Sequence, residues 1–138
     1  MNQDMKHIII VCEGETEQEF VRDILRQPFL YRGILLDFPK IKRSNGGIVK
    51  WNLLKEQIER HLREGRKPYV TTFIDYYGIS DKHQFPGWVE AHKISDKSRR
   101  IDCLQQAMRN DIHEELRSRF IPYIQLHEFE ALLFIDEE

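Results

Sequence analysis

The sequence predicts an α/β domain in which three layers are built around a mostly parallel, four-stranded sheet. The first observation is the alternation of strand-like and helix-like segments in the order βαβαβαβα, which is typical of parallel strands joined by helical crossovers. The second is a continuous apolar run at residues 8–12, which suits a strand buried on both faces. The third is the β-rich run at residues 69–74, which is followed directly by an aspartate, in the position where open α/β sheets bind ligands.

The first half of the chain is expected to form two strands and two helices. The first helix begins at about Thr16, because Thr16 and Glu19 have the spacing of a capping box. Pro28 is expected to end or kink this helix, since proline lacks the backbone donor. A weaker strand lies within residues 34–42, and the proline inside it indicates an edge position. The second helix has apolar residues three and four positions apart over residues 48–62.

The second half continues the same alternation after a long connection. Residues 76–98 are expected to be irregular apart from a short helix near residues 89–93, and connections of this length often form lids or binding loops. A third helix carries an apolar stripe over residues 101–116 and a last strand spans residues 120–126. A final helical segment at residues 128–134 is strongly apolar close to the last residue, which indicates a chain cut short relative to a longer natural protein.

Composition predicts a single domain over residues 1–138, long enough for a proper core. The formal net charge of −2 argues against a strongly basic nucleic-acid footprint, so any basic surface must be local. The sequence contains neither an apolar run of membrane-spanning length nor a signal-peptide start, which predicts no membrane partner. Cys12 and Cys103 lie in apolar contexts without metal-ligand spacing, which predicts reduced thiols and a cytoplasmic location.

Four glutamates follow the first predicted strand within seven residues, and two of them are candidates for chemistry. Glu13 is expected at the carboxyl end of the strand, and Glu17 in the first turn of the following helix. Glu15 is interpreted as facing solvent and Glu19 as the capping residue. An alternative for Glu17 is that it only complements the helix dipole.

Asp75 is the second acidic element, because it ends the strand at residues 69–74. The carboxyl ends of parallel strands meet at one edge of a sheet, so we expect Asp75 to lie opposite Glu13. Two carboxylates with water suit Mg²⁺, which takes few protein ligands. The alternative is that Asp75 is a turn residue or a helix N-cap.

A third polar group follows the last predicted strand. His127 and Glu128 could be ligands, a proton-transfer pair, substrate contacts or partners of the ligands. Glu130 is either a further ligand or an acidic first-turn residue. The spacing is not that of the His-Glu-x-x-His zinc motif, so zinc-protease chemistry is not supported.

Two loops carry clusters of basic residues. Lys40, Lys42 and Arg43 stand shortly before Gly46 and Gly47, and glycine-loop amides beside cations can hold the phosphates of a substrate. The second cluster consists of Lys93, Lys97, Arg99 and Arg100. The alternative is that these charges are simply solvated. An acidic strand-end site flanked by basic loops suits metal-assisted phosphoryl chemistry on an anionic substrate.

Four motifs occur in the order found in the bacterial family known as domain of unknown function 4276, and the chain resembles that family over nearly its whole length. They are Val-Cys-Glu-Gly-Glu-Thr-Glu-Gln-Glu-Phe, Phe-Ile-Asp-Tyr-Tyr-Gly, Phe-Pro-Gly and Ile-Gln-Leu-His-Glu-Phe-Glu-Ala-Leu-Leu-Phe. Members usually continue beyond the last motif. The family in turn is similar to the toprim domain, the Rossmann-like, metal-binding fold of topoisomerases, primases and overcoming-lysogenization-defect nucleases.

The resemblance implies roles for individual residues. Glu13 matches the glutamate that ends the first toprim strand, and Glu17 matches the second glutamate of the nuclease-type branch. Asp75 matches the first aspartate of the Asp-x-Asp motif. Tyr77 stands where the second aspartate belongs, and a phenol cannot replace a carboxylate as a hard-metal ligand. By hypothesis, the missing carboxylate comes from Glu128 or Glu130.

The function that the resemblance implies is a Mg²⁺- or Mn²⁺-dependent toprim-like nuclease or phosphoryl-transfer domain acting on nucleic acid. The metal candidates are Glu13, Asp75, Glu128 and Glu130, and the catalytic candidates are Glu13, Glu17, Asp75 and Glu128. Relatives are often encoded beside an ATPase in what look like defence systems, which implies an ATPase partner. The alternative is a catalytically inactive toprim-like module that regulates or recruits the ATPase. A nucleotide-binding domain is disfavoured, because neither G-x-G-x-x-G nor G-x-x-x-x-G-K-[ST] occurs.

Overall fold

The computed structural model describes residues 5–42 and 47–126 and has the predicted α/β architecture. Its strands are β1 Lys6–Cys12, β2 Ile34–Asp37, β3 Tyr69–Asp75, β4 Phe120–Ile121 and β5 Ile124–Gln125. Its α-helices are α1 Glu15–Phe20, α2 Arg26–Tyr31, α3 Trp51–Leu62, α4 Trp88–Ala91 and α5 Lys97–Asp111. A π-helical turn, Val21–Leu25, joins α1 to α2, and 3₁₀ turns occupy Tyr76–Gly78, Asp81–His83 and Glu114–Arg119.

The strands form one parallel sheet in the order β2-β1-β3-β4, with β5 also paired to β3. Strand β2 lies at the edge, as predicted. The register pairs Cys12 of β1 with Phe73 of β3, and Asp75 of β3 with Gln125 of β5. The carboxyl ends of β1, β3 and β5 therefore meet at one edge of the sheet.

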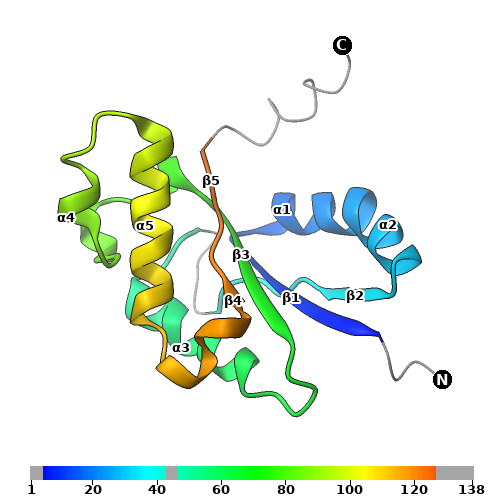
Figure 1. The fold of residues 1–138 in the computed structure, drawn as a ribbon. Coiled ribbons are helices and arrows are strands. Elements are labelled where there is room, and N and C mark those ends of the chain that lie inside the picture. The colour runs from blue at the N-terminus through cyan, green and yellow to red at the C-terminus, as the bar shows by residue number, and fades with distance from the viewer. Residues whose placement is uncertain (1–4, 43–46, 127–138) are drawn as a thin grey trace.

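The sheet has one apolar core on each of its faces. Helices α3 and α5 lie on one face and the α1–α2 segment on the other, so the fold has three layers (Figure 1). Alternate residues of β1 point to opposite faces, so Val11 enters the larger core while Ile10 enters the smaller one. The larger core contains the buried faces of α3 and α5, including Leu54 and Leu104. The smaller core lies between β1, β2 and β3 on one side and the α1–α2 segment on the other.

The start of the first helix differs from the sequence prediction. The N-cap is Gly14, and the Glu17 carboxylate, not that of Glu19, reaches back to accept from the Gly14 N–H at 3.0 Å. The predicted Thr16–Glu19 capping box is therefore wrong, and both residues are exposed. A glycine supplies no side-chain cap, which sequence rules for serine and threonine caps do not anticipate.

Pro28 does not end the first helix, because α2 runs through it to Tyr31. The irregularity lies one turn earlier, in the π-helical turn, where the Arg26 N–H bonds to the Val21 carbonyl. A proline cannot donate to the carbonyl four residues before it and crowds it, and a widened preceding turn accommodates this.

Further along the chain, the predicted segments are present but shorter. Helix α3 begins only at Trp51, and α5 ends at Asp111, so Ile112 and Leu116 are buried outside the helix. The predicted last strand is interrupted between Ile121 and Ile124. The predicted segment 128–134 lies outside the described residues. Among the helices of residues 5–42 and 47–126, none has the length and apolarity needed to cross a membrane.

Candidate acidic site at the carboxyl edge of the sheet

Glu13 and Asp75 meet where β1 and β3 end, as the strand-end argument predicted. The Asp75 N–H donates to Glu13 Oε1 at 2.9 Å, and the Glu13 N–H donates to the Phe73 carbonyl at 3.1 Å. The turn after β3 also closes over this carboxylate, since a Cβ built on Gly78 would lie 3.3 Å from Glu13 Oε2. The end of β3 thus holds the Glu13 side chain in place through backbone atoms.

Three carboxylates at this edge each accept a backbone N–H through one oxygen. Glu13 Oε1 accepts from Asp75, Glu17 Oε1 accepts from Gly14 at 3.0 Å, and Asp75 Oδ1 accepts from Tyr77 at 3.2 Å. These bonds restrict the rotation of each carboxylate and leave its second oxygen for another partner. Asp75 accordingly also has the turn and N-cap role that the sequence left as an alternative, whereas the capping role of Glu17 was predicted for Glu19.

The electrostatic setting of Glu13 favours a bound positive charge. Burial raises the pKa of the Glu13 carboxyl above its ordinary value, the Asp75 N–H opposes this, and the charges of Glu17 and Asp75 raise the pKa further. Burial, with a smaller contribution from Glu17, also raises the pKa of the neighbouring Cys12 thiol to about 12. Cys12 is therefore an unreactive core thiol, whereas the carboxylates repel one another and would gain from a cation.

A pocket of about 440 Å³ opens beside these carboxylates. Its lining residues are Glu13, Gly14, Glu15, Thr16, Glu17, Lys40 and Ile41. Asp75 is not part of the lining and adjoins the pocket through its bond to Glu13. The exposed Glu15 carboxylate lies 3.6 Å from Lys40 Nζ, so a cation from a distant part of the sequence partly balances the acidic run.

Lys40 reaches the pocket because the chain after β2 is bonded to β1 and to α3. The Cys12 N–H donates to the Pro39 carbonyl and the Ile41 N–H donates to the Cys12 carbonyl, at 2.8 and 2.9 Å. The buried Gln57 amide donates to the Lys40 carbonyl at 3.1 Å and accepts from the Lys42 N–H at 2.8 Å. Gln57 is therefore the side chain that fixes one wall of the pocket.

Tyr77 is 58% exposed. It stands where the second aspartate of the Asp-x-Asp motif is expected. Its ring packs edge-on against Tyr76, with centroids 5.2 Å apart. Lys97 Nζ donates to the Tyr77 hydroxyl at 3.2 Å and lies 5.6 Å from the ring centroid. The exposed ring of Tyr77, two residues after Asp75, thus lies in contact with the ammonium group of Lys97.

Other predicted site residues are not brought to this pocket. Lys42 lines a separate depression of about 260 Å³ together with Arg60, and Gly47 is partly exposed. In the second basic cluster, Arg100 points inward and donates twice to the Ile94 carbonyl. The remaining predicted residues, namely Arg43, Gly46, His127, Glu128 and Glu130, lie outside the described residues.

Within the described part of the chain, no three His, Cys, Asp or Glu side chains gather in a geometry that could hold a metal ion. Glu13, Glu17 and Asp75 therefore do not by themselves complete a three-ligand metal site, and a further carboxylate would have to come from elsewhere. The donor chemistry of Glu13 and Asp75, hard carboxylate oxygens, fits Mg²⁺ or Mn²⁺, and Mg²⁺ commonly takes only one or two protein carboxylates.

Sequence reasoning missed two residues that shape the site. Gln57 is a polar side chain within the apolar stripe of α3, at 2% exposure, and buried polar side chains almost always have bonding partners. Gly78 follows Asp75 by three residues, where a side chain would press on Glu13. The sequence did contain a signal for each. Gln57 is a polar residue at an apolar helical position, and Gly78 is a glycine shortly after a strand-end aspartate.

Comparison with known proteins identifies one family, whose function is unknown. A family model described as "Domain of unknown function (DUF4276)" matches residues 12–138. No curated protein matches, and no solved structure matches.

Proposed function

This chain belongs to the DUF4276 family, and we propose that it is a toprim-like domain that uses Mg²⁺ or Mn²⁺ in phosphoryl transfer on nucleic acid. The observation that supports the proposal most is the orientation of Glu13, Glu17 and Asp75, each of which accepts one backbone N–H. Oriented hard oxygen donors at the carboxyl edge of a parallel sheet are typical of metal-dependent sites.

In this proposal Glu13 and Asp75 hold the cation, Glu17 supports it, and Glu128 or Glu130 supplies a further carboxylate. The bound ion would polarise a phosphoryl oxygen and lower the pKa of a water nucleophile. The protein itself contributes the fixed carboxylates, the shielding of Glu13 by burial, and the wall formed by Lys40 and Ile41.

Tyr77 and Lys97 support nucleic acid as the substrate class. An exposed ring offers a stacking surface for an unpaired base, and a lysine beside it offers a partner for a phosphate. Base stacking on an aromatic side chain contributes about 1–3 kcal/mol. We therefore expect Tyr77→Ala to weaken binding of single-stranded oligonucleotides, with binding measured by fluorescence anisotropy.

The central experiment compares two glutamates of the same acidic run. Calorimetric titration of the protein with Mn²⁺ should give binding that is lost in Glu13→Gln and retained in Glu19→Gln, because Glu19 is exposed and takes no part in the site. A nuclease assay with Mg²⁺ or Mn²⁺, with and without an ATPase partner, should follow the same order. Equal cleavage by Glu13→Gln and the native protein would reject the role of Glu13.

A second candidate function is a catalytically inactive toprim-like module that regulates or recruits an ATPase. Tyr77 favours it, since a phenol stands where the second metal-binding aspartate would be. The two functions predict different titrations. Absence of Mn²⁺ binding together with a stable complex with the ATPase would support the module, whereas Mn²⁺ binding that depends on Glu13 would support the enzyme.

A further inference from the structure

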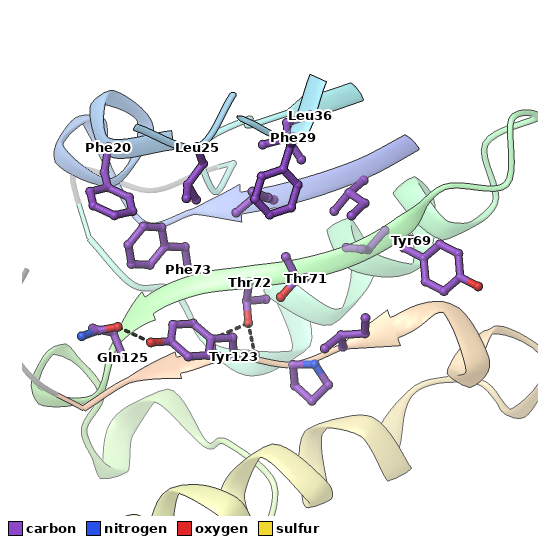
Figure 2. Close-up of a pocket in the computed structure, with 15 residues that line it drawn as sticks. Phe20, Leu25, Phe29, Leu36, Tyr69, Thr71, Thr72, Phe73, Tyr123 and Gln125 are labelled. Carbon is purple, nitrogen blue, oxygen red and sulfur yellow. Dashed lines mark hydrogen bonds between the residues drawn. The ribbon is translucent and has the colours of Figure 1, made fainter. Parts of the chain in front are cut away.

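A second pocket, about 420 Å³ in volume, lies on the face of the sheet that carries α1 and α2, and it is almost entirely apolar. We call it the apolar groove, and its main lining residues are Ile10, Leu25, Phe29, Phe73, Ile121 and Tyr123. Figure 2 shows the groove with Leu25 and Phe29 on one side, Tyr123 on the other and Phe73 between them. The α1–α2 segment therefore forms only one wall, beside β1 and β2.

The strands on the far side of the groove are covered on one face only. Towards α5, Phe120 of β4 and Ile124 of β5 are buried in the larger core. Towards the groove, Ile121 is 55% exposed and Tyr123 is 44% exposed within the described part of the chain. Parallel sheets are normally buried on both faces, and residues 5–42 and 47–126 leave Ile121 and Tyr123 on this face only partly covered.

We propose that residues 128–135 of this same chain form a helix that occupies the apolar groove. Gln125 lines the groove and ends β5, so the segment starts three residues from the groove itself. A helix that follows a parallel strand after a short loop packs back onto its own sheet. Position and chain connectivity therefore both favour this segment over a separate partner.

The sequence of the segment matches the chemistry of the groove. Phe129, Leu132 and Leu133 have the i, i+3, i+4 spacing that places side chains on one face of a helix. A helix with its side chains is about 10–12 Å wide, and three neighbouring strands at about 4.8 Å spacing span about 10 Å. One helix that runs back along the strands is thus wide enough to cover β1, β3 and β4 in the groove.

Docking in the groove has a consequence for the acidic edge, and this consequence rests on the proposed function. Asp75 pairs with Gln125 in the sheet register, and Glu128 follows Gln125 by three residues. A helix that starts at Glu128 and runs back over the sheet begins at the edge where Asp75 lies. The apolar contact of Leu132 and Leu133 would then position the carboxylate that the Glu13–Asp75 pair lacks.

The test is NMR of the full 138-residue chain in buffer with a chelator, so that the outcome does not depend on metal binding. We expect nuclear Overhauser contacts between the methyl groups of Leu132 or Leu133 and the side chains of Ile121 and Tyr123, and slow amide exchange over residues 129–135. Absence of these contacts, or free exchange of these amides, would overturn the proposal. Contacts that disappear on dilution would also overturn it, because they would come from a second copy.

Two variants make the test specific to the groove. Ile121→Asp introduces a charge at the docking surface and should reduce the amide protection of residues 129–135 by about tenfold or more, as expected when local opening is favoured by 1.4 kcal/mol. Val89→Asp is the matched control, because Val89 is 61% exposed and lies outside the groove. Equal protection in the two variants would place the segment elsewhere. Docking without any Mn²⁺ binding would refute the proposed function alone.

Discussion

Thr72→Val should destabilise the protein far more than the loss of one oxygen atom suggests. Thr72 is 1% exposed, and its hydroxyl lies at the interruption between β4 and β5. Oγ1 donates to the Tyr123 carbonyl at 2.7 Å and accepts from the Tyr123 N–H at 2.9 Å. Valine has nearly the same shape as threonine, so the substitution removes both bonds without opening a cavity and leaves two backbone groups unpaired.

The expected cost follows from these two groups. An unpaired buried donor or acceptor costs about 1–3 kcal/mol, and the partial exposure of Tyr123 favours the lower part of this range. We therefore expect a loss of about 2–4 kcal/mol, which corresponds to a fall in Tm of roughly 8–16 °C for a domain of this size.

Thermal and urea denaturation followed by circular dichroism measure this loss. Thr72→Ser is the control, because serine keeps the hydroxyl and should cost only about 1 kcal/mol for the missing methyl group. If Thr72→Val melts at the native temperature, or if Thr72→Ser is the less stable variant, the hydroxyl does not hold the interrupted strand and the reasoning is refuted.

Three further predictions follow from single contacts. Gly87→Ala should leave little folded protein, measured as soluble yield and Tm, because Gly87 has φ +73° and a Cβ there would lie 2.7 Å from the Ala107 Cβ. Gln57→Leu should cost about 2–4 kcal/mol in urea denaturation by stranding the Lys40 carbonyl and the Lys42 N–H, whereas an unchanged midpoint would contradict its wall-fixing role. Glu13→Gln should remove a pH dependence of the free energy of unfolding. The folded state raises the pKa of this carboxyl and so binds the proton more tightly, and the stability of the native protein should fall as pH rises from the ordinary glutamate value through the raised one. Denaturation midpoints across pH 4–8 that change identically in both proteins would contradict this.

Local sequence patterns were sufficient for much of the fold because they depend on neighbours along the chain. The continuous apolar run of β1 and the β-rich run of β3 predicted two central strands, and β2 was correctly predicted at the edge. The same patterns failed at the start of α1, where Glu17 caps the helix in place of Glu19. The failure arose because the N-cap is Gly14, a residue that has no side chain to indicate where the helix begins.

For the candidate site, the sequence by itself determined that Glu13 and Asp75 stand at the ends of strands, since each directly follows a run of apolar or β-forming residues. Only the tertiary structure decided that β1 and β3 are neighbours and that the Asp75 N–H binds the Glu13 carboxylate. It also brought Lys40 to the pocket through the bond between Gln57 and the Lys40 carbonyl. These contacts join residues far apart in the chain, and their energies come from burial and pairing across the fold, which local sequence patterns do not encode.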